Sequence, residues 1–339
     1  MGKIAIIGAG GWGTALAIVL GRARQSHAIA LWVREKDVLD SLQRERENAA
    51  FLPGFRLPSQ VEITGELEDA LRDAEIVIGA MPSAHVRKMY TAMLPFLRAE
   101  MRFVSATKGL EPETLLRMTE VIAQVTTRKF RPRTAALSGP SFAKEVARGD
   151  PTAVVVASSD RDTAKRVQQE FSGPTLRLYT NEDVIGIELG GALKNIIAIA
   201  AGVAEGLGLG HNTIAALITR GLAEIMRLGT ALGARVQTLA GLAGLGDLVL
   251  TCTGDLSRNR FVGAELARGK KLDEILASTR MVAEGVGTTA AARTLAHKAG
   301  VEMPITEQMF AVLYKGRTAQ DALRELMERR LKAESGHGA

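Results

Sequence analysis

The chain of 339 residues is poor in cysteine and in aromatic residues. Cys252 is its one cysteine, so neither a disulfide within the chain nor a zinc site built on several cysteines is possible. Because disulfides are rare in reducing compartments, a chain of this kind fits such a compartment, and we expect a cytoplasmic protein. Aromatic residues make up 4% of the chain, against 46% apolar residues in all. This balance suits helices packed closely on a parallel sheet.

Long apolar runs and runs of one charge are also missing. No uninterrupted apolar stretch reaches the ~18 residues that span a bilayer, and the short run 4–7 does not have the features of a signal peptide. The net charge is only +6, and no Lys- and Arg-rich run is interleaved with aromatic residues. The five histidines lack the spacing of metal ligands. We therefore expect no membrane span, no nucleic acid and no metal. The slight positive charge is either solvated surface or an attraction for anionic small molecules.

Short strand-like runs alternate with helix-like segments as far as about residue 180. Strands are predicted at 4–7, 28–33, 75–79, 102–106, 134–137 and 151–157. Helices are predicted between them at 12–20, 36–46, 86–97, 112–125, 141–148 and 160–171. This alternation predicts an α/β domain with a doubly wound parallel sheet over residues 1–180.

Strand signals nearly vanish after residue 180. Helices are predicted at 185–207, 212–231, 261–268, 289–299, 305–314 and 319–329. We expect an all-α domain over residues 181–339 that binds substrate and carries the catalytic groups. The helix from Ile185 is apolar nearly all round, which is typical of a helix buried at the centre of a domain or at an interface. Apolar helices are abundant here, so a homodimer through this domain is a further expectation.

A G-x-G-x-x-G pattern lies between the first strand and the first helix. Gly8 permits a tight turn, Gly10 lets the backbone approach a pyrophosphate, and Gly13 lets the helix pack on the strand. The helix start at Gly11 and Trp12 offers free amides to an anion. The alternative is a glycine-rich turn without a ligand. Because both strand and helix are in place, the pattern favours a Rossmann-like dinucleotide-binding domain.

Arg34 directly follows the second strand, where an acidic residue would bind the ribose 2′-hydroxyl of NAD. An arginine at this position instead accepts the 2′-phosphate of NADP. Arg34 therefore favours NADPH weakly over NADH, although Glu35 beside it carries the opposite charge. The alternative is that Arg34 is simply an exposed charge.

Lys194 stands in the middle of a long apolar helix. Burial of an ammonium group is costly, so Lys194 has to be paired, to have a lowered pKa, or to face a cleft. Those conditions make a lysine a proton donor or acceptor near neutral pH. The alternative is a lysine whose amine extends to solvent.

Lys108, Ser141 and Asp247 are further candidates for the site. Lys108 follows a strand, and ligands bind at the carboxyl ends of parallel strands. It could also be a surface lysine. Ser141 lies in a second strand-to-helix turn and is, from the residues alone, better explained as a helix N-cap. Asp247 could orient Lys194 or bind substrate hydroxyls, or it could cap a helix.

Ser257, Arg258 and Asn259 open another predicted helix. Ser257 is a suitable N-cap, and Arg258 and Asn259 would lie at the positive end of the helix. A phosphate group binds well there, because an arginine fork and backbone amides act together. The alternative is a simple cap beside exposed arginines.

Taken in order, these motifs resemble bacterial-type glycerol-3-phosphate dehydrogenase, NAD(P)-dependent, over nearly the whole chain. The resemblance rests on Gly8-Ala-Gly-Gly-Trp-Gly13, Leu31-Trp-Val-Arg34, Ala106-Thr-Lys-Gly-Leu110, Leu137-Ser-Gly-Pro-Ser-Phe-Ala143, Ala192-Leu-Lys-Asn195, Gly244-Leu-Gly-Asp-Leu248, Thr251-Cys-Thr253, Ser257-Arg-Asn-Arg260 and Val282-Ala-Glu-Gly285.

The resemblance implies reversible reduction of dihydroxyacetone phosphate to sn-glycerol 3-phosphate, which feeds glycerophospholipid synthesis. It implies that Lys194 is the proton acceptor or donor. The residues implied to hold substrate are Lys108, Gly139, Ser141, Lys194, Asp247, Ser257, Arg258 and Asn259. Those implied to contact NAD or NADP, besides the turn glycines, are Gly11, Trp12, Arg34, Lys108, Ala143, Arg258, Val282 and Glu284.

Two other functions stay open on the residues alone. A related two-domain dehydrogenase acting on a hydroxy acid would have the same fold and lysine chemistry but a carboxylate site. A protein that senses NADPH would keep the glycine turn without needing Lys194, Asp247 and the cluster at Ser257 together.

Overall fold

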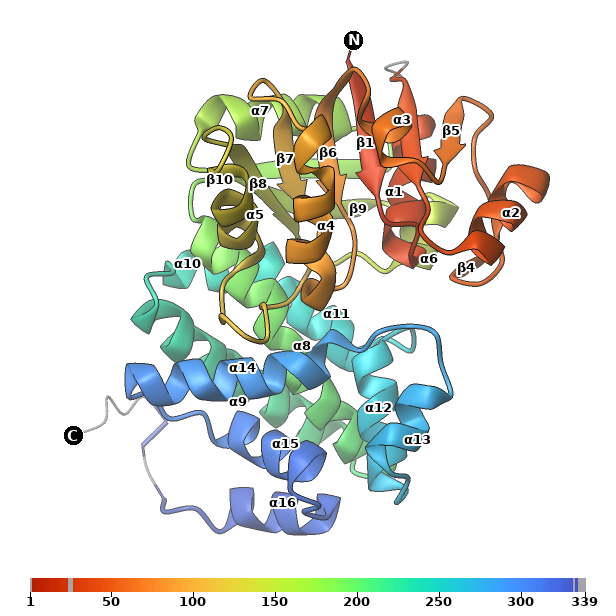
Figure 1. Ribbon diagram of the computed structural model, residues 1–339. Coiled ribbons are helices and arrows are strands. Elements are labelled where there is room, and N and C mark those ends of the chain that lie inside the picture. The colour runs from red at the N-terminus through yellow and green to blue at the C-terminus, as the bar shows by residue number, and fades with distance from the viewer. Residues whose placement is uncertain (1, 24–26, 332, 335–339) are drawn as a thin grey trace.

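The structure is a computed structural model that describes residues 2–23, 27–331 and 333–334. It has two parts, which lie one above the other in Figure 1. The upper part is built on an eight-stranded sheet and ends with the last strand at Asn181; we call it the sheet half. The lower part begins with α8 at Val184 and contains only helices among its described residues; we call it the helical half.

The large sheet has the strand order β10-β9-β8-β7-β6-β1-β2-β5. Its strands are β1 (Lys3–Ile7), β2 (Ile29–Trp32), β5 (Val61–Thr64), β6 (Ala74–Gly79), β7 (Arg102–Ser105), β8 (Arg133–Ser138), β9 (Thr152–Ala157) and β10 (Leu176–Asn181). A small hairpin joins β3 (Glu47–Asn48) to β4 (Leu52–Arg56). The predicted doubly wound α/β sheet is confirmed, with one difference at its end.

That difference lies at β9, which pairs antiparallel with β8. A parallel neighbour needs a crossover that returns the chain to the opposite end of the sheet. The six-residue helix α6 (Ala143–Arg148) packs on α1 and does not cross the sheet, so β9 starts near the end where β8 stopped. β10 then pairs parallel with β9, and these two strands run against the other six.

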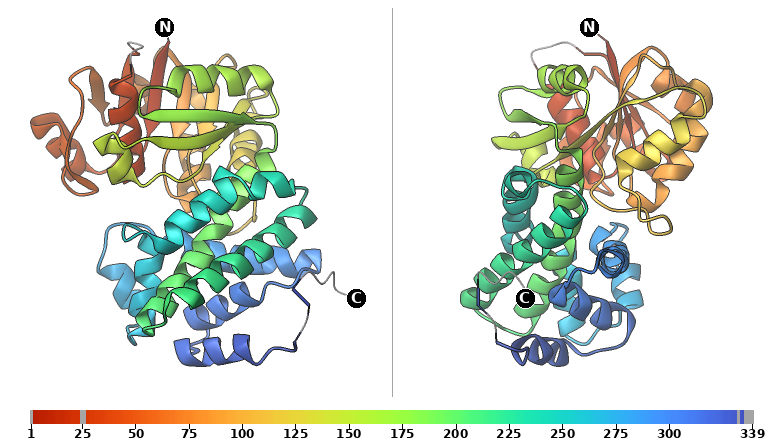
Figure 2. Two further views of the ribbon diagram at one scale, coloured as in Figure 1. Left: turned by 180° about the vertical axis from the view of Figure 1, so that it is seen from behind. Right: turned by 90° about the vertical axis from the view of Figure 1, so that its left-hand side faces the viewer.

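Helices cover both faces of the sheet, as the edge-on view in Figure 2 shows. Side chains alternate along β1: Ile4 and Ile6 belong to one buried cluster, Ala5 and Ile7 to another. The helices of this half are α1 (Gly11–Gly21), α2 (Lys36–Glu45), α3 (Leu67–Leu71), α4 (Val86–Met93), α5 (Met118–Thr126), α6 and α7 (Arg161–Phe171), with short turns η1 (Ser83–His85) and η2 (Leu94–Phe96).

Two predicted helices are shorter in the structure. The helix expected at 86–97, with an interruption at Pro95, ends at Met93, and a 3-10 turn containing Pro95 follows, because proline cannot donate the next helical hydrogen bond. The helix expected at 112–125 begins only at Met118. Leu115 has a φ of 64°, and this left-handed conformation is incompatible with a continuous right-handed helix.

The helical half is arranged around α8 (Val184–Gly206), in which every residue from Gly186 to Ala204 is buried. The other helices are α9 (His211–Ala231), α10 (Val236–Leu239), the π-helical turn η3 (Leu242–Gly246), α11 (Asp247–Thr253), α12 (Arg258–Ala267), α13 (Leu272–Ala277), α14 (Glu284–Ala299), α15 (Pro304–Tyr314) and α16 (Ala319–Met327). The prediction of a buried central helix from Ile185 is confirmed.

Two apolar helical stretches of the described chain have the length and composition to cross a membrane, Val184–Gly206 and Val236–Thr253. In the first, 89% of the apolar window is buried inside the protein, as in the core helix of a folded protein. The second is divided among α10, η3 and α11, so neither is a clear membrane span.

Candidate active site

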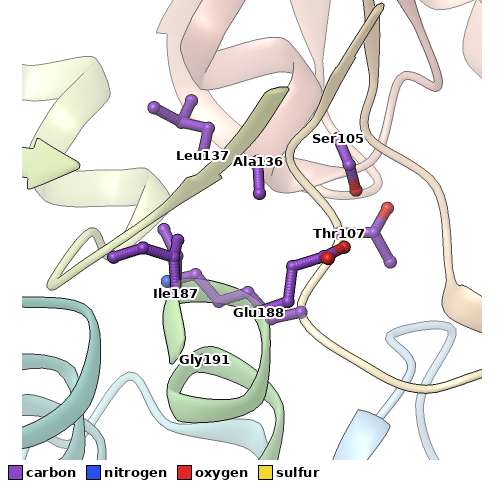
Figure 3. A pocket seen from close by; sticks show the side chains of 9 residues that line it. Ser105, Thr107, Ala136, Leu137, Ile187, Glu188 and Gly191 are labelled. Carbon is purple, nitrogen blue, oxygen red and sulfur yellow. The ribbon is translucent and has the colours of Figure 1, made fainter. Parts of the chain in front are cut away.

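The carboxyl ends of the parallel strands face the helical half, and α8 meets the sheet there (Figure 1). Figure 3 shows the junction: Ser105 and Thr107 come from the end of β7, Ala136 and Leu137 from β8, and Ile187, Glu188 and Gly191 from α8. A Cβ atom on Gly191 would lie 2.4 Å from Ser138 Oγ. Glycine at this position therefore lets α8 approach β8 closely, which brings Lys194 near the sheet edge.

Three charged side chains meet at this junction. Asp247 Oδ1 lies 2.9 Å from Lys194 Nζ, and Asp247 Oδ2 lies 2.7 Å from Lys108 Nζ. The Asp247 side chain is 1% exposed, against 7% for Lys194 and 18% for Lys108. One carboxylate thus bridges two ammonium groups from opposite halves of the chain. The structure brings together the three residues that the sequence named as catalytic candidates.

Burial and charge act on these groups in opposite directions. Burial lowers the pKa of Lys194 to about 8, although the Asp247 carboxylate works to raise it and the Lys108 ammonium lowers it further. Burial raises the pKa of Asp247, but the two ammonium groups outweigh it and hold that pKa below its ordinary value. Lys194 can therefore exchange a proton near neutral pH beside a carboxylate that stays charged. The alternative of a solvent-exposed Lys194 amine is wrong.

The Lys108 amine is fixed by the second strand-to-helix turn. It donates to Gly139 O at 2.8 Å and to Ser141 Oγ at 3.2 Å. Gly139 has a φ of 137°, and a Cβ there would lie 3.0 Å from Val154 Cα, so glycine is required. The N-cap of α6 is Phe142, so the interpretation of Ser141 as the helix cap is wrong. Its hydroxyl instead donates to Gly139 O and accepts from Lys108.

Thr251 belongs to the same cluster, although in the sequence it was quoted only as part of a motif and was given no role. Lys194 Nζ donates to Thr251 Oγ1 at 2.6 Å, and this hydroxyl donates to Asp247 O at 2.7 Å. The available signal was its spacing of four residues from Asp247, which places both on one face of α11. Asp247 itself makes no capping bond to α11, so the cap interpretation of this residue is wrong.

The glycine turn has the features that a dinucleotide needs. A Cβ on Gly8 would lie 2.7 Å from Ala80 O, and one on Gly13 would lie 1.9 Å from Gly8 O. Gly10, in contrast, faces open space. No side chain caps the start of α1, so its first amides are free for an anion. The buried indole N–H of Trp12 has no acceptor among the described residues. The turn therefore fits a pyrophosphate-containing cofactor.

The other predicted cofactor residues lie around this turn and the junction. The Arg34 guanidinium is 57% exposed and pairs with Glu35. Ala143 Cβ lies near Gly11, and Val282 is exposed. Glu284 accepts from Ser83 N at 2.9 Å and from Ser83 Oγ at 2.6 Å. Ser83 was not predicted, because a contact across 201 residues leaves no local signal in the sequence.

The cap predicted at the start of α12 is present. Ser257 caps the helix by accepting from Arg260 N, and Arg258 is exposed in the first turn. Asn259 is buried, and both ends of its amide are engaged: it donates to Asn195 Oδ1 and accepts from Gly285 N, each at 2.9 Å. Asn259 therefore holds the starts of α12 and α14 against α8.

Comparisons with known proteins show the family of this chain. The fold and the glycine turn define a two-part dehydrogenase that takes a nicotinamide dinucleotide. Models of the N-terminal and C-terminal parts of NAD-dependent glycerol-3-phosphate dehydrogenase match residues 3–164 and 183–324. The chain belongs to this family, as the motifs predicted.

Individual relatives are similar over almost their whole length. Glycerol-3-phosphate dehydrogenase (NAD(P)+) of Koribacter versatilis is 62% identical over 97% of this chain and 98% of its own. The protein of the same name from Acidobacterium capsulatum is 55% identical over 97% and 98%. The crystal structure of glycerol-3-phosphate dehydrogenase from Coxiella burnetii is 40% identical and covers 97% of this chain and 99% of its own, with a TM-score of 0.92. The predicted enzyme class and the prediction of NAD or NADP are confirmed.

Proposed function

We propose that this chain reversibly reduces dihydroxyacetone phosphate to sn-glycerol 3-phosphate with NADH or NADPH. The observation that carries this proposal is the Asp247 carboxylate held between the amines of Lys108 and Lys194. Such a cluster presents two cations to a polar substrate and keeps one of them near its titration point. The hydride that reaches C2 of the substrate comes from the bound nicotinamide cofactor.

Lys194 supplies the proton in this scheme. Negative charge grows on the C2 oxygen during reduction, and the Lys194 ammonium group stabilises it and then donates the proton. In the reverse direction, the neutral amine accepts the proton from the hydroxyl. Asp247 and Thr251 fix the amine in position through the contacts at 2.9 and 2.6 Å. Lys108 binds the substrate beside Gly139 and Ser141.

The start of α12 is proposed to hold the substrate phosphate. Arg258 is an exposed residue in the first turn of α12, where Ser257 accepts from Arg260 N and leaves the preceding amides for an anion. Burial lowers the pKa of Arg258, and the charge of Glu284 raises it; we propose that Arg258 lies between the phosphate and the cofactor. Binding energy gained at the phosphate orients the carbonyl for reaction. Direct contact between Asn259 and substrate stays a prediction.

The cofactor is proposed to lie along the carboxyl edge of the sheet, with its pyrophosphate at the α1 turn. The residues proposed to contact it are Gly8, Gly10, Gly11, Trp12, Gly13, Arg34, Lys108, Ala143, Arg258, Val282 and Glu284. Gly10 leaves space for the pyrophosphate, and the first amides of α1, which no side chain caps, would donate to it.

The wider assignments remain proposals that these features support. We propose a dinucleotide-binding domain over residues 1–180 and a substrate domain over 181–339, of which residues 1, 24–26, 332 and 335–339 lie outside the described residues. We further propose a phosphorylated small-molecule substrate, a cytoplasmic location, a supply of glycerol phosphate to phospholipid synthesis, and a homodimer through the helical half.

The test is oxidation of NADH or NADPH followed at 340 nm. Dihydroxyacetone phosphate is expected to support rapid oxidation, and unphosphorylated dihydroxyacetone is not. Lys194→Ala is expected to lose about 1000-fold or more in kcat while it binds the cofactor as the wild type does. A variant within tenfold of the wild type would contradict the proton role. If only keto acids, the oxidised forms of hydroxy acids, support this oxidation, the substrate assignment is wrong.

A further inference from the structure

One loop of the helical half reaches over to the sheet half. It joins α13 to α14 across residues 278–283, and in Figure 1 it lies at the right, below α2 and β4. Arg280 Nη1 lies 2.6 Å from Asp37 Oδ2, and Arg280 Nη2 lies 3.3 Å from Asp37 Oδ1. The same guanidinium lies 5.5 Å from the ring centroid of Phe51. Arg280 thus contacts the sheet half at α2 and at the loop before β4.

The place that Arg280 reaches is the end of β2. Asp37 is in the first turn of α2, directly after Arg34 and Glu35. In dinucleotide-binding sheets, the end of the second strand faces the ribose 2′ position of the adenosine. Arg34 Nη2 pairs with Glu35 Oε1 at 2.6 Å, and the charge of Glu35 also acts on Arg280. Two arginines from different halves and two acids therefore gather around one position.

We propose that Arg280 is a second ligand of the 2′-phosphate of NADP or NADPH, supplied by the helical half, and that it determines cofactor specificity together with Arg34. This inference rests on the proposed function, because it assumes that the cofactor lies along the Gly8–Gly13 turn. In the absence of the 2′-phosphate, Asp37 and Glu35 occupy the two guanidinium groups.

The charges favour exchange of one anion for another. The Arg280–Asp37 pair is exposed, with 53% and 61% of the side chains accessible, and exposed pairs of this kind contribute little. A phosphate monoester carries a charge of about −1.5 to −2 and three acceptor oxygens, and a guanidinium fork binds it in a bidentate manner. No side chain caps the start of α2, so its free amides add to the attraction. NAD has no 2′-phosphate and leaves the pair intact.

The test compares 2′,5′-ADP with 5′-AMP, which differ only in the 2′-phosphate. Their dissociation constants are measured by calorimetry for the wild type, Arg280→Gln and Asp37→Asn. The control is Arg324→Gln, which also removes an exposed arginine paired with an aspartate, Asp321, but on α16. We expect Arg280→Gln to weaken 2′,5′-ADP about five- to tenfold and 5′-AMP less than twofold. The control is expected to change neither.

Asp37→Asn separates a phosphate ligand from a simple contact between the two halves. Both variants break the same ion pair. If Arg280 binds the phosphate, Asp37→Asn removes its competitor, so 2′,5′-ADP binds at least as tightly as to the wild type. If the pair merely holds the loop, both variants weaken the two nucleotides alike. That outcome, or no binding of either nucleotide by the wild type, would overturn the inference.

Turnover with NADPH and NADH distinguishes this inference from the proposed function. A selective loss of 2′,5′-ADP binding in Arg280→Gln supports the role of Arg280 even if dihydroxyacetone phosphate is not reduced, in which case only the proposed reaction fails. Normal reduction by both cofactors, with an unchanged NADPH-to-NADH ratio of kcat/KM in Arg280→Gln, overturns the inference alone.

Discussion

Asp247 faces two ammonium groups with a single carboxylate. The cluster of Lys108, Lys194 and Asp247 therefore carries a net charge of about +1 when both lysines are protonated. An uncompensated buried charge is unfavourable, and loss of a proton from Lys194 removes it. Negative charge that develops on a substrate oxygen also compensates this excess positive charge, and the compensation stabilises the transition state.

This balance predicts a particular pH dependence of the wild type. Reduction requires the Lys194 ammonium form, so kcat/KM for dihydroxyacetone phosphate should fall as the pH rises through about 8, the pKa of Lys194. Oxidation of glycerol 3-phosphate requires the neutral amine and should rise over the same range. Steady-state rates in both directions between pH 6 and pH 10 measure this. If the rates of reduction and of oxidation changed in the same direction with pH, the assignment of Lys194 as proton donor and acceptor would be contradicted.

In Asp247→Asn, the fall of kcat/KM at alkaline pH, which we call the alkaline limb of the pH profile, should occur at lower pH than in the wild type. The carboxylate raises the pKa of Lys194, so its removal favours the neutral amine and shifts the limb by about one pH unit or more. The shift accompanies a loss of kcat, because the lysines also lose their common partner. Asp321→Asn, at the exposed start of α16, is the control. An unshifted limb would mean that Asp247 only positions the substrate.

At the residue scale, a functional side chain can be predicted from the sequence when its local context is unusual. Lys194 was predictable because an ammonium in an apolar helix needs a partner, and Ser257 because a helix start needs a cap. Asp247 was one candidate partner of Lys194 among several alternatives, but its contact with Lys108 was not predictable, since these two residues lie 139 residues apart. Ser141 was interpreted wrongly for the same reason: its hydroxyl serves a lysine from another strand.

At the scale of elements, α8 and α12 cross in backbone contact. A Cβ on Gly202 of α8 would lie 1.9 Å from Arg260 O, and a Cβ on Gly263 of α12 would lie 1.9 Å from Ile199 O. Glycine from each helix lets the other approach closely. This crossing fixes the position of the start of α12, which carries Ser257 and Arg258, relative to Lys194 on α8.

Gly202→Ala should therefore destabilise the protein by about 2–3 kcal/mol, because the added methyl group overpacks a rigid backbone contact. Gly287→Ala in α14 is the matched control. A Cβ there meets nothing within 4 Å, and alanine favours the helix, so the free energy of unfolding should rise by up to about 1 kcal/mol. Urea unfolding measures both. Equal effects of the two variants would show that the α8–α12 contact is not rigid.

Glu224, a residue of α9, caps the N-terminus of the neighbouring helix α15. Its carboxylate accepts from Ile305 N at 2.6 Å and from Thr306 N at 3.2 Å. Burial raises the pKa of Glu224 to about 7, against an ordinary 4.5, although these amides lower it. The folded state therefore binds the proton more readily than the unfolded state, so this group's contribution to stability declines as the pH rises from about 4.5 to about 7.

Glu224→Gln should lack this pH dependence. The difference in unfolding free energy between the wild type and the variant should fall by up to about 3 kcal/mol as the pH rises from 4.5 to 7. Denaturant unfolding at several pH values measures it. A constant difference would mean that Glu224 keeps its ordinary pKa in the folded protein.

Helices and strands were predictable where the apolar residues recur with a single clear period or form a continuous run. The buried strands and the long helices follow directly from apolar runs. β5 was missed, because it covers only Val61 to Thr64 and includes Glu62. β10 was missed although its first four residues alternate between buried and exposed, which is the pattern of a half-buried strand. The reversal of β9 depends on where α6 packs, which no local pattern records.

At the scale of the whole molecule, a further ion pair joins the halves, in addition to Lys108–Asp247 and Arg280–Asp37. Glu188 of α8 accepts from Arg117 Nη1 at 2.6 Å, from Thr119 N at 2.8 Å and from Thr119 Oγ1 at 2.6 Å. Burial raises the pKa of Glu188, and Arg117 is the main group that lowers it. The carboxylate lies two turns before Lys194 on the same helix, so it fixes that helix to α5 of the sheet half.

Arg117→Met should destabilise the protein by about 3 kcal/mol, because it leaves a buried carboxylate without its countercharge. The loss should be smaller at low pH, where Glu188 is protonated. Arg324→Gln again provides an exposed comparison. Thermal unfolding at pH 5 and pH 8 measures both variants. Equal stability of Arg117→Met and wild type at pH 8 would show that the pair does not join the halves.

The order of the elements along the chain gives α8 a further consequence during synthesis. All eight strands of the large sheet end by Asn181, and α8 begins only at Val184. A ribosome therefore releases the complete cofactor-binding sheet before it makes Lys194, and Asp247 and Arg258 follow later still. Because N-terminal units fold first during translation, we expect the nascent chain to acquire dinucleotide binding well before it can acquire turnover. A chain interrupted within the helical half would then sequester cofactor without consuming it.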